Sequence, residues 1–191
     1  MIINMYITLM PVILAGIMNM IFTKTSIYKK YRSPIDCNKK LKDGKRIFGD
    51  NKTWIGFFSM IIFGSLSQIL WGIVCKIFFS GRNYLYLNVE NTILNNILIG
   101  AILGATYVIF ELPNSFIKRR IDIKPGKTEK GIKGIVFYII DQIDSIIGVT
   151  LSLTIWCEIP FWQFILYIIL GGATHIIVNL ALYKLKIRKN I

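Results

Sequence analysis

The stretch from Thr53 to Cys75 reads TWIGFFSMIIFGSLSQILWGIVC and contains no Asp, Glu, Lys or Arg, with Lys52 and Lys76 on either side of it. A helix rises about 1.5 Å per residue, so a stretch of this length crosses the roughly 30 Å hydrocarbon core of a bilayer. The stretch therefore predicts a transmembrane helix.

Four further stretches have the same apolar character. The first of them has no basic residues in front of it, which a cleaved signal peptide needs, so we expect it to be retained as a helix. We predict an all-α, polytopic integral membrane protein that forms one domain over residues 1–191. Its five transmembrane helices are expected at about 2–23, 53–76, 91–110, 134–157 and 159–183.

The composition excludes several classes of protein. The chain is 54% hydrophobic with a mean hydropathy of +0.56, and its net charge is +13, from 23 Lys and Arg against 10 Asp and Glu. Soluble globular enzymes and disordered chains do not combine this apolar content with long uncharged stretches. The three cysteines lack the spacing of a disulfide framework or a metal site.

The basic residues are distributed very unevenly among the segments between the predicted helices. Segments 24–52 and 111–133 hold 10 and 7 Lys and Arg, and the tail from Lys184 holds 4, whereas segment 76–90 holds 2. By the positive-inside rule, loops 24–52 and 111–133 and the C-terminus are cytoplasmic and the N-terminus is outside. We therefore expect a multi-pass protein of the cell membrane with its polar chemistry on the cytoplasmic face.

Asp141 and Asp144 are the acidic residues of the fourth predicted helix. Residues three apart lie on the same face of a helix, and a carboxylate within a membrane must be stabilised by a partner. Mg²⁺ is a suitable partner, because it is commonly held by one or two carboxylates together with substrate phosphates. Pairing with basic residues and proton relay remain alternatives for these two residues.

Two polar segments accompany this pair. The segment after the third predicted helix carries Lys and Arg donors suited to phosphate oxygens, although anionic lipid surfaces attract any such basic segment. The segment before the second helix combines glycines, acids, bases, an amide and a hydroxyl, and Thr53 is a candidate helix cap. The candidate substrate-binding residues are Asn114, Ser115, Lys118, Arg119 and Arg120 in the first segment and Asp43, Asp50, Asn51, Lys52 and Thr53 in the second.

Three other features are weaker signals. His175 in the fifth predicted helix is interpreted as a hydrogen-bonded packing residue, because the chain has no second histidine. Glu111 fits either the end of a helix or the same site as the aspartates. Gly100 and Gly104 form a GxxxG motif, which is common by chance in apolar segments and carries little weight alone.

Three strings together resemble the archaeal CDP-archaeol synthase family, whose members are integral membrane cytidylyltransferases related to CDP-diacylglycerol synthases. The strings are GKRIFGDNKTWIGF (Gly44 to Phe57), ELPNSFIKRRIDIKPG (Glu111 to Gly126) and DQIDSIIG (Asp141 to Gly148). THIIVNLALYKLK, from Thr174 to Lys186, matches more loosely. Asp122, Lys124 and the ending from Lys186 to Lys189 depart from the family pattern.

The resemblance implies transfer of CMP from CTP to the lipid phosphate 2,3-di-O-geranylgeranylglyceryl phosphate, with release of pyrophosphate and with Mg²⁺ as cofactor. It implies that Asp141 and Asp144 bind the metal and that Lys118 and Arg119 bind the phosphates of CTP or of the lipid. It places the segment from Asp43 to Thr53 on the nucleotide side of the site. We expect no nucleic-acid partner.

Several alternatives stay open at this point. The same reaction on diacyl phosphatidic acid would make the protein a CDP-diacylglycerol synthase. A proton-coupled transporter would use Asp141, Asp144 and His175 as relay groups, and a non-catalytic protein would bind anionic lipids through its basic loops. A CDP-alcohol phosphotransferase is disfavoured, because its DGxxAR…DxxxD pattern is absent from the chain.

Overall fold

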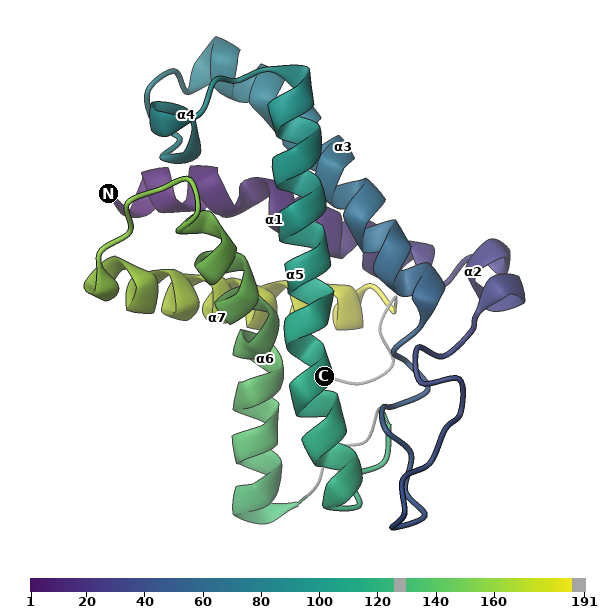
Figure 1. Cartoon of the computed structure of the whole chain (residues 1–191). Coiled ribbons are helices and arrows are strands. Elements are labelled where there is room, and N and C mark those ends of the chain that lie inside the picture. The colour runs from purple at the N-terminus through teal and green to yellow at the C-terminus, as the bar shows by residue number, and fades with distance from the viewer. Residues whose placement is uncertain (126–129, 187–191) are drawn as a thin grey trace.

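The computed structural model describes residues 1–125 and 130–186, and the regular secondary structure of these residues is helical (Figure 1). All three cysteines are free, as predicted. The helices are α1 (Ile2–Phe22), α2 (Ser26–Tyr31), α3 (Trp54–Phe78), α4 (Leu85–Asn88), α5 (Ile93–Arg120), α6 (Gly131–Leu153) and α7 (Phe161–Lys184).

Five of these helices, α1, α3, α5, α6 and α7, are long and apolar enough to cross a membrane, which confirms the prediction of a five-helix membrane protein. Only 28–39% of the residues in their most apolar windows are buried in the protein, so most of this apolar surface faces outward. On α3, the outward side chains include Ile62 and Leu70, whereas small and polar residues such as Gly64 and Gln68 are buried. This inverted polarity is expected where the surrounding solvent is lipid.

Helix α5 runs through the middle of the bundle, with α3 on one side and α6 on the other (Figure 1). Helices α3 and α5 approach most closely at glycines. A Cβ placed on Gly100 would lie 2.4 Å from the carbonyl oxygen of Gly64, and one placed on Gly104 would lie 2.4 Å from that of Met60. The GxxxG motif, which carried little weight in the sequence, therefore forms the contact between these two helices.

The main difference from the sequence-based expectation is the end of α5. We expected this helix to stop at Phe110 and residues 111–133 to form a loop, but α5 continues to Arg120 and α6 begins at Gly131. The expected boundary rested on the charge of Glu111. In the structure Glu111 is neutralised by an ion pair, and the helix passes through Pro113. Of the connecting residues 121–130, those at 126–129, including the last residue of the ELPNSFIKRRIDIKPG string, lie outside the described residues, as does the chain from 187 onward.

Loop 32–53, between α2 and α3, folds around the buried carboxylate of Asp36. Arg46 donates to this carboxylate through Nε at 3.1 Å and through Nη2, and the backbone N–H groups of Phe48 and Asn38 donate at 3.0 and 3.1 Å. Burial by itself raises the pKa of Asp36, but these hydrogen bonds outweigh it and hold the pKa below its ordinary value. The loop is therefore built around a charged carboxylate.

We expect Asp36→Asn to lower the stability of the solubilised protein by about 1.5–3 kcal/mol at neutral pH, because hydrogen bonds to a charged group are lost. A carboxyl group whose pKa is lowered by folding contributes stability above its unfolded pKa of about 4. That contribution disappears as the pH falls through the lower, folded value. Melting temperatures measured from pH 3 to pH 8 should thus separate the two proteins at neutral pH and begin to converge below about pH 4. Asp50→Asn, at an exposed partner of Arg46, is the control and should change little. A constant difference across the whole pH range would contradict this account of the loop.

Candidate active site

The centre of the candidate site is the side-chain amide of Asn114 on α5, which donates to both aspartates of α6. Its Nδ2 lies 2.6 Å from Oδ1 of Asp141 and 2.7 Å from Oδ2 of Asp144. The ammonium group of Lys118 forms an ion pair with the carboxylate of Asp141. One amide and one cation therefore bring two carboxylates together, and this group of four residues is called the aspartate cluster below.

Regular helix geometry on both sides produces the aspartate cluster. Asp141 and Asp144 are three residues apart on α6 and share a face, as predicted. Asn114 and Lys118 are four residues apart on α5 and share a face for the same reason. The cluster therefore depends on the continuation of α5 to Arg120, which the sequence analysis did not predict.

Lys52 and Glu111 form a second, half-buried ion pair next to the aspartate cluster. Burial by itself lowers the pKa of Lys52, but attraction to Glu111, and then to Asp144 and Asp141, outweighs it and raises the pKa above its ordinary value. Lys52 is thus a permanent cation beside three carboxylates. From the sequence, Glu111 fits either the end of a helix or the site of the aspartates. Because it lies three residues before Asn114, the two side chains share a face of α5, and this spacing indicates a place beside the aspartate cluster.

Two buried polar atoms beside the aspartates have no hydrogen-bond partner among the described residues. They are Oδ1 of Asn114 and Oγ of Ser145. A buried acceptor without a partner is costly, and carboxylate and amide oxygens are the ligands that hard divalent cations prefer. In residues 1–125 and 130–186, no cluster of three or more His, Cys, Asp and Glu side chains has the arrangement of a metal site. The two carboxylates fit a cation that substrate oxygens help to coordinate. Because Nδ2 of Asn114 lies between them, its Oδ1 would join this coordination when the amide is turned over.

Arg119 and Ser115 lie against the glycine turn of loop 32–53. The hydroxyl of Ser115 accepts a hydrogen bond of 3.1 Å from the backbone N–H of Gly49. A Cβ placed on Gly49 would lie 3.2 Å from Nη1 of Arg119, so the loop backbone packs directly on this guanidinium. Arg119 is buried, and its Nε and Nη1 have no hydrogen-bond partner in the part of the chain that the structure describes. A buried cation with free donors is suited to a phosphate oxygen.

The remaining predicted site residues tie loop 32–53 to α5 or stabilise the loop itself. Arg120 pairs with Asp43 at 2.6 Å, and Lys45 pairs with Asp122 at 2.7 Å. Asp122, which departs from the family pattern, therefore has a partner in the loop. Asp50 pairs with Arg46 within the loop, and Asn51 is exposed beside Gly49.

Thr53 has a structural role in the arrangement. Its side chain caps α3 by accepting a hydrogen bond of 3.2 Å from Gly56 N, which confirms the predicted cap. The same oxygen also lies 2.8 Å from the hydroxyl of Tyr28. The structure thus gives the Thr53 hydroxyl two protein partners, and we do not assign it to substrate.

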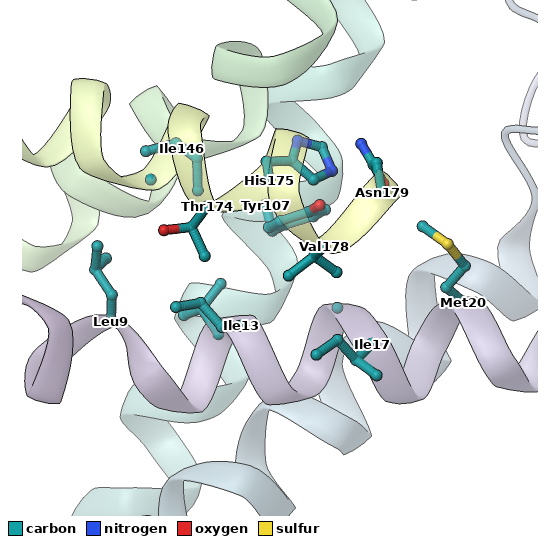
Figure 2. A pocket seen from close by; sticks show the side chains of 13 residues that line it. Leu9, Ile13, Ile17, Met20, Tyr107, Ile146, Thr174, His175, Val178 and Asn179 are labelled. Carbon is teal, nitrogen blue, oxygen red and sulfur yellow. The ribbon is translucent and has the colours of Figure 1, made fainter. Parts of the chain in front are cut away.

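A pocket lies between α1 and α7, with α5 and α6 behind it (Figure 2). Its walls are mostly apolar. Leu9, Ile13 and Ile17 come from α1, and Thr174, His175 and Asn179 come from α7. His175, interpreted from the sequence as a packing residue, lies here with its Nδ1 3.3 Å from the carbonyl oxygen of Gln142. A pocket of this kind accommodates an apolar chain.

Comparison with known proteins gives consistent results for the whole chain. A family model described as CarS-like, CDP-archaeol synthase, matches residues 1–191. The CDP-archaeol synthase of Sulfurisphaera tokodaii is 30% identical over 162 residues, which cover 84% of this chain and 82% of the relative. Those of Methanocaldococcus jannaschii and Pyrococcus furiosus are 28% and 30% identical over 156 and 154 residues, or 82% and 81% of this chain and 81% and 80% of the relatives.

A solved structure described as an intramembrane enzyme for archaeal membrane lipids biosynthesis is similar in fold. It superposes with a TM-score of 0.62 over 92% of this chain and 90% of the other, at 19% sequence identity. At this level of identity the likeness supports the arrangement of the helices.

Proposed function

The chain belongs to the CDP-archaeol synthase family, and on that premise we propose that the aspartate cluster is the site where CMP is transferred from CTP to 2,3-di-O-geranylgeranylglyceryl phosphate. The products are CDP-archaeol and pyrophosphate. The protein is a membrane enzyme of lipid biosynthesis, with CTP and a lipid phosphate as substrates.

The observation that carries the proposal is the geometry around Asn114. Two carboxylates converge on one amide group, and the amide oxygen beside them is buried without a partner. A purely structural cluster would use this oxygen as well, because an unsatisfied buried acceptor is destabilising. We therefore assign Asp141 and Asp144 to a Mg²⁺ ion, with the Asn114 amide turned so that its oxygen takes the place of Nδ2 beside the carboxylates. When bound, this ion would neutralise charge on the phosphates of CTP.

The chemistry of the step requires positioning more than proton transfer. An oxygen of the lipid phosphate, already an anion at neutral pH, attacks the α-phosphorus of CTP. The bond from that phosphorus to the oxygen that bridges to the β-phosphorus breaks, and pyrophosphate leaves with the bonding electrons. Such transfers depend mainly on alignment and on electrostatic stabilisation of the leaving group.

The cations around the aspartate cluster supply this stabilisation. We assign the free donors of Arg119 to a phosphate oxygen, because the guanidinium is buried and already positioned by the Gly49 turn. Lys118, which forms an ion pair with Asp141, is close enough to the carboxylates to bind a phosphate brought to the metal. Lys52 keeps its charge in the same region through its pair with Glu111.

The lipid and the nucleotide approach from different directions in this proposal. The pocket between α1 and α7 is suited to an isoprenoid chain, since its walls are apolar and it lies within the membrane-spanning part of the chain. Loop 32–53 and the end of α5 carry many of the basic residues. We propose that they face the cytoplasm, where CTP is available, as the positive-inside rule predicts.

We expect the purified protein in detergent, with CTP and Mg²⁺, to release pyrophosphate when digeranylgeranylglyceryl phosphate is added. Diacyl phosphatidic acid, tested in parallel, should give at most slow turnover. Faster turnover with the diacyl lipid would move the protein to CDP-diacylglycerol synthesis. Absence of turnover with both lipids, from protein shown to be folded, would contradict the proposal.

A further inference from the structure

Helix α7 holds α6 at Gln142, the residue between the two aspartates. Asn179 donates from Nδ2 to the side-chain oxygen of Gln142 at 3.0 Å, and His175 contacts its backbone carbonyl oxygen at 3.3 Å through Nδ1. A carbonyl oxygen can only accept, so Nδ1 of His175 carries the proton. Gln142 and Asn179 are both buried. These three residues form what is called the Gln142 clamp below.

The clamp acts on the side of α6 away from the aspartate cluster. At about 100° per residue, Gln142 is about 100° from Asp141 around the helix axis and about 160° from Asp144. Helix α6 is therefore held from two directions, by Asn114 and Lys118 on α5 and by the clamp on α7. Rotation of α6 about its own axis would break the clamp and turn both carboxylates away from Asn114.

Close packing brings α7 near enough to form the clamp. A Cβ placed on Gly171 would lie 2.6 Å from Cγ2 of Ile146, and one placed on Gly172 would lie 2.9 Å from Cγ2 of Ile143. His175 and Asn179 follow within two turns on α7, and both also line the pocket between α1 and α7 (Figure 2). The buried Oδ1 of Asn179 has no hydrogen-bond partner among the described residues. The same two side chains thus contact the pocket and the aspartate-bearing helix.

We propose that His175 and Asn179 are positioning residues, which hold Gln142 so that Asp141 and Asp144 keep the orientation needed to bind Mg²⁺ together. The inference rests on the metal assignment of the proposed function, but the clamp itself acts on metal binding and can be tested without CTP or lipid.

The first experiment measures the stabilisation of the solubilised protein by Mg²⁺ alone. Asn179→Leu keeps the number and branching of the side-chain heavy atoms and removes the donor, and we expect the Mg²⁺ concentration for half-maximal thermal stabilisation to rise about tenfold, as for other groups that orient metal ligands. His175→Gln keeps an N–H donor and should stay within about threefold of wild type, whereas His175→Leu should behave like Asn179→Leu. Ile177→Leu is the control on the same helix, since this side chain is 64% exposed and lies outside the pocket lining, and it should leave the Mg²⁺ response unchanged.

The second experiment separates the clamp from general loss of stability. In the presence of both substrates, Asn179→Leu should lower kcat about tenfold at saturating CTP while the KM for CTP changes little. Gln142→Leu combined with Asn179→Leu should be no worse than either single variant, because the two act through one contact. Additive losses, or an unchanged Mg²⁺ response in both leucine variants, would overturn the proposal.

Three further outcomes are distinguishable. If a leucine variant does not fold, Asn179→Ala tests the same lost donor, and an unchanged Mg²⁺ response there also overturns the clamp. A wild-type protein without any stabilisation by Mg²⁺ would overturn the clamp together with the metal assignment. A wild-type protein that is stabilised by Mg²⁺ but turns over neither lipid would contradict only the proposed function.

Discussion

We expect Asp141→Asn and Asp144→Asn each to reduce CMP transfer by at least about 10²–10³-fold, the range for removal of one preorganised electrostatic group, while the protein stays folded. Asparagine has the shape of aspartate, and its oxygen can still accept the hydrogen bond that Asn114 donates. What is lost is the negative charge, and with it the attraction to a divalent cation. Pyrophosphate release at saturating CTP, titrated with Mg²⁺, measures the effect.

The two variants are not equivalent, which makes the comparison informative. Asp141 balances Lys118, so Asp141→Asn also leaves a mostly buried ammonium group without its partner. Asp144→Asn leaves that ion pair intact and is the cleaner test of charge at the site. Asp122→Asn is the matched control, because this carboxylate belongs to a 76% exposed side chain that pairs with Lys45, and its loss should be nearly silent. Full activity in either cluster variant would remove the metal assignment.

The membrane helices could be predicted from the sequence because each depends on a local property. A stretch of about 20 apolar residues with few or no charges predicts a spanning helix whatever surrounds it, and all five such helices are present. The end of α5 depends instead on distant partners. Glu111 and Lys118 continue a helix because Lys52 and Asp141, 59 and 23 residues away in the chain, neutralise them. A prediction based on charge alone therefore ended α5 at Phe110, ten residues before its actual end at Arg120.

The residues of the candidate site divide in the same way, into those that a local signal predicts and those that depend on distant partners. Asp141 and Asp144 could be found from the sequence, since their spacing on one helix is a local signal. Asn114 was assigned to a phosphate-binding loop, but its contact with both aspartates requires α5 and α6 to lie side by side. The core of loop 32–53 was missed for a related reason. Asp36 and Arg46 each resemble an ordinary surface charge, and only the folded loop buries the carboxylate between them.

The contact between α3 and α5 is where a small change should have the largest effect on stability. We expect Gly100→Ala to destabilise the solubilised protein by about 3 kcal/mol, the upper range for overpacking, and to lower its melting temperature by about 5–10 °C. The added methyl group would lie 2.4 Å from the carbonyl oxygen of Gly64 and 2.6 Å from the Cα of Ser65. Both are backbone atoms that no change of rotamer can move aside, so the two helices must separate.

Separation of α3 from α5 would also reach the candidate active site. Lys52 lies two residues before the start of α3 and pairs with Glu111 on α5, across the end of this contact. Gly100→Ala should therefore lower activity as well as stability. Gly16→Ala makes the same substitution on α1, where the nearest atom to the new methyl group is the Tyr107 hydroxyl at an ordinary 3.9 Å. We expect that control to melt like wild type. If the two alanine variants had equal melting temperatures, close approach of α3 and α5 at Gly100 would not be what holds these helices together.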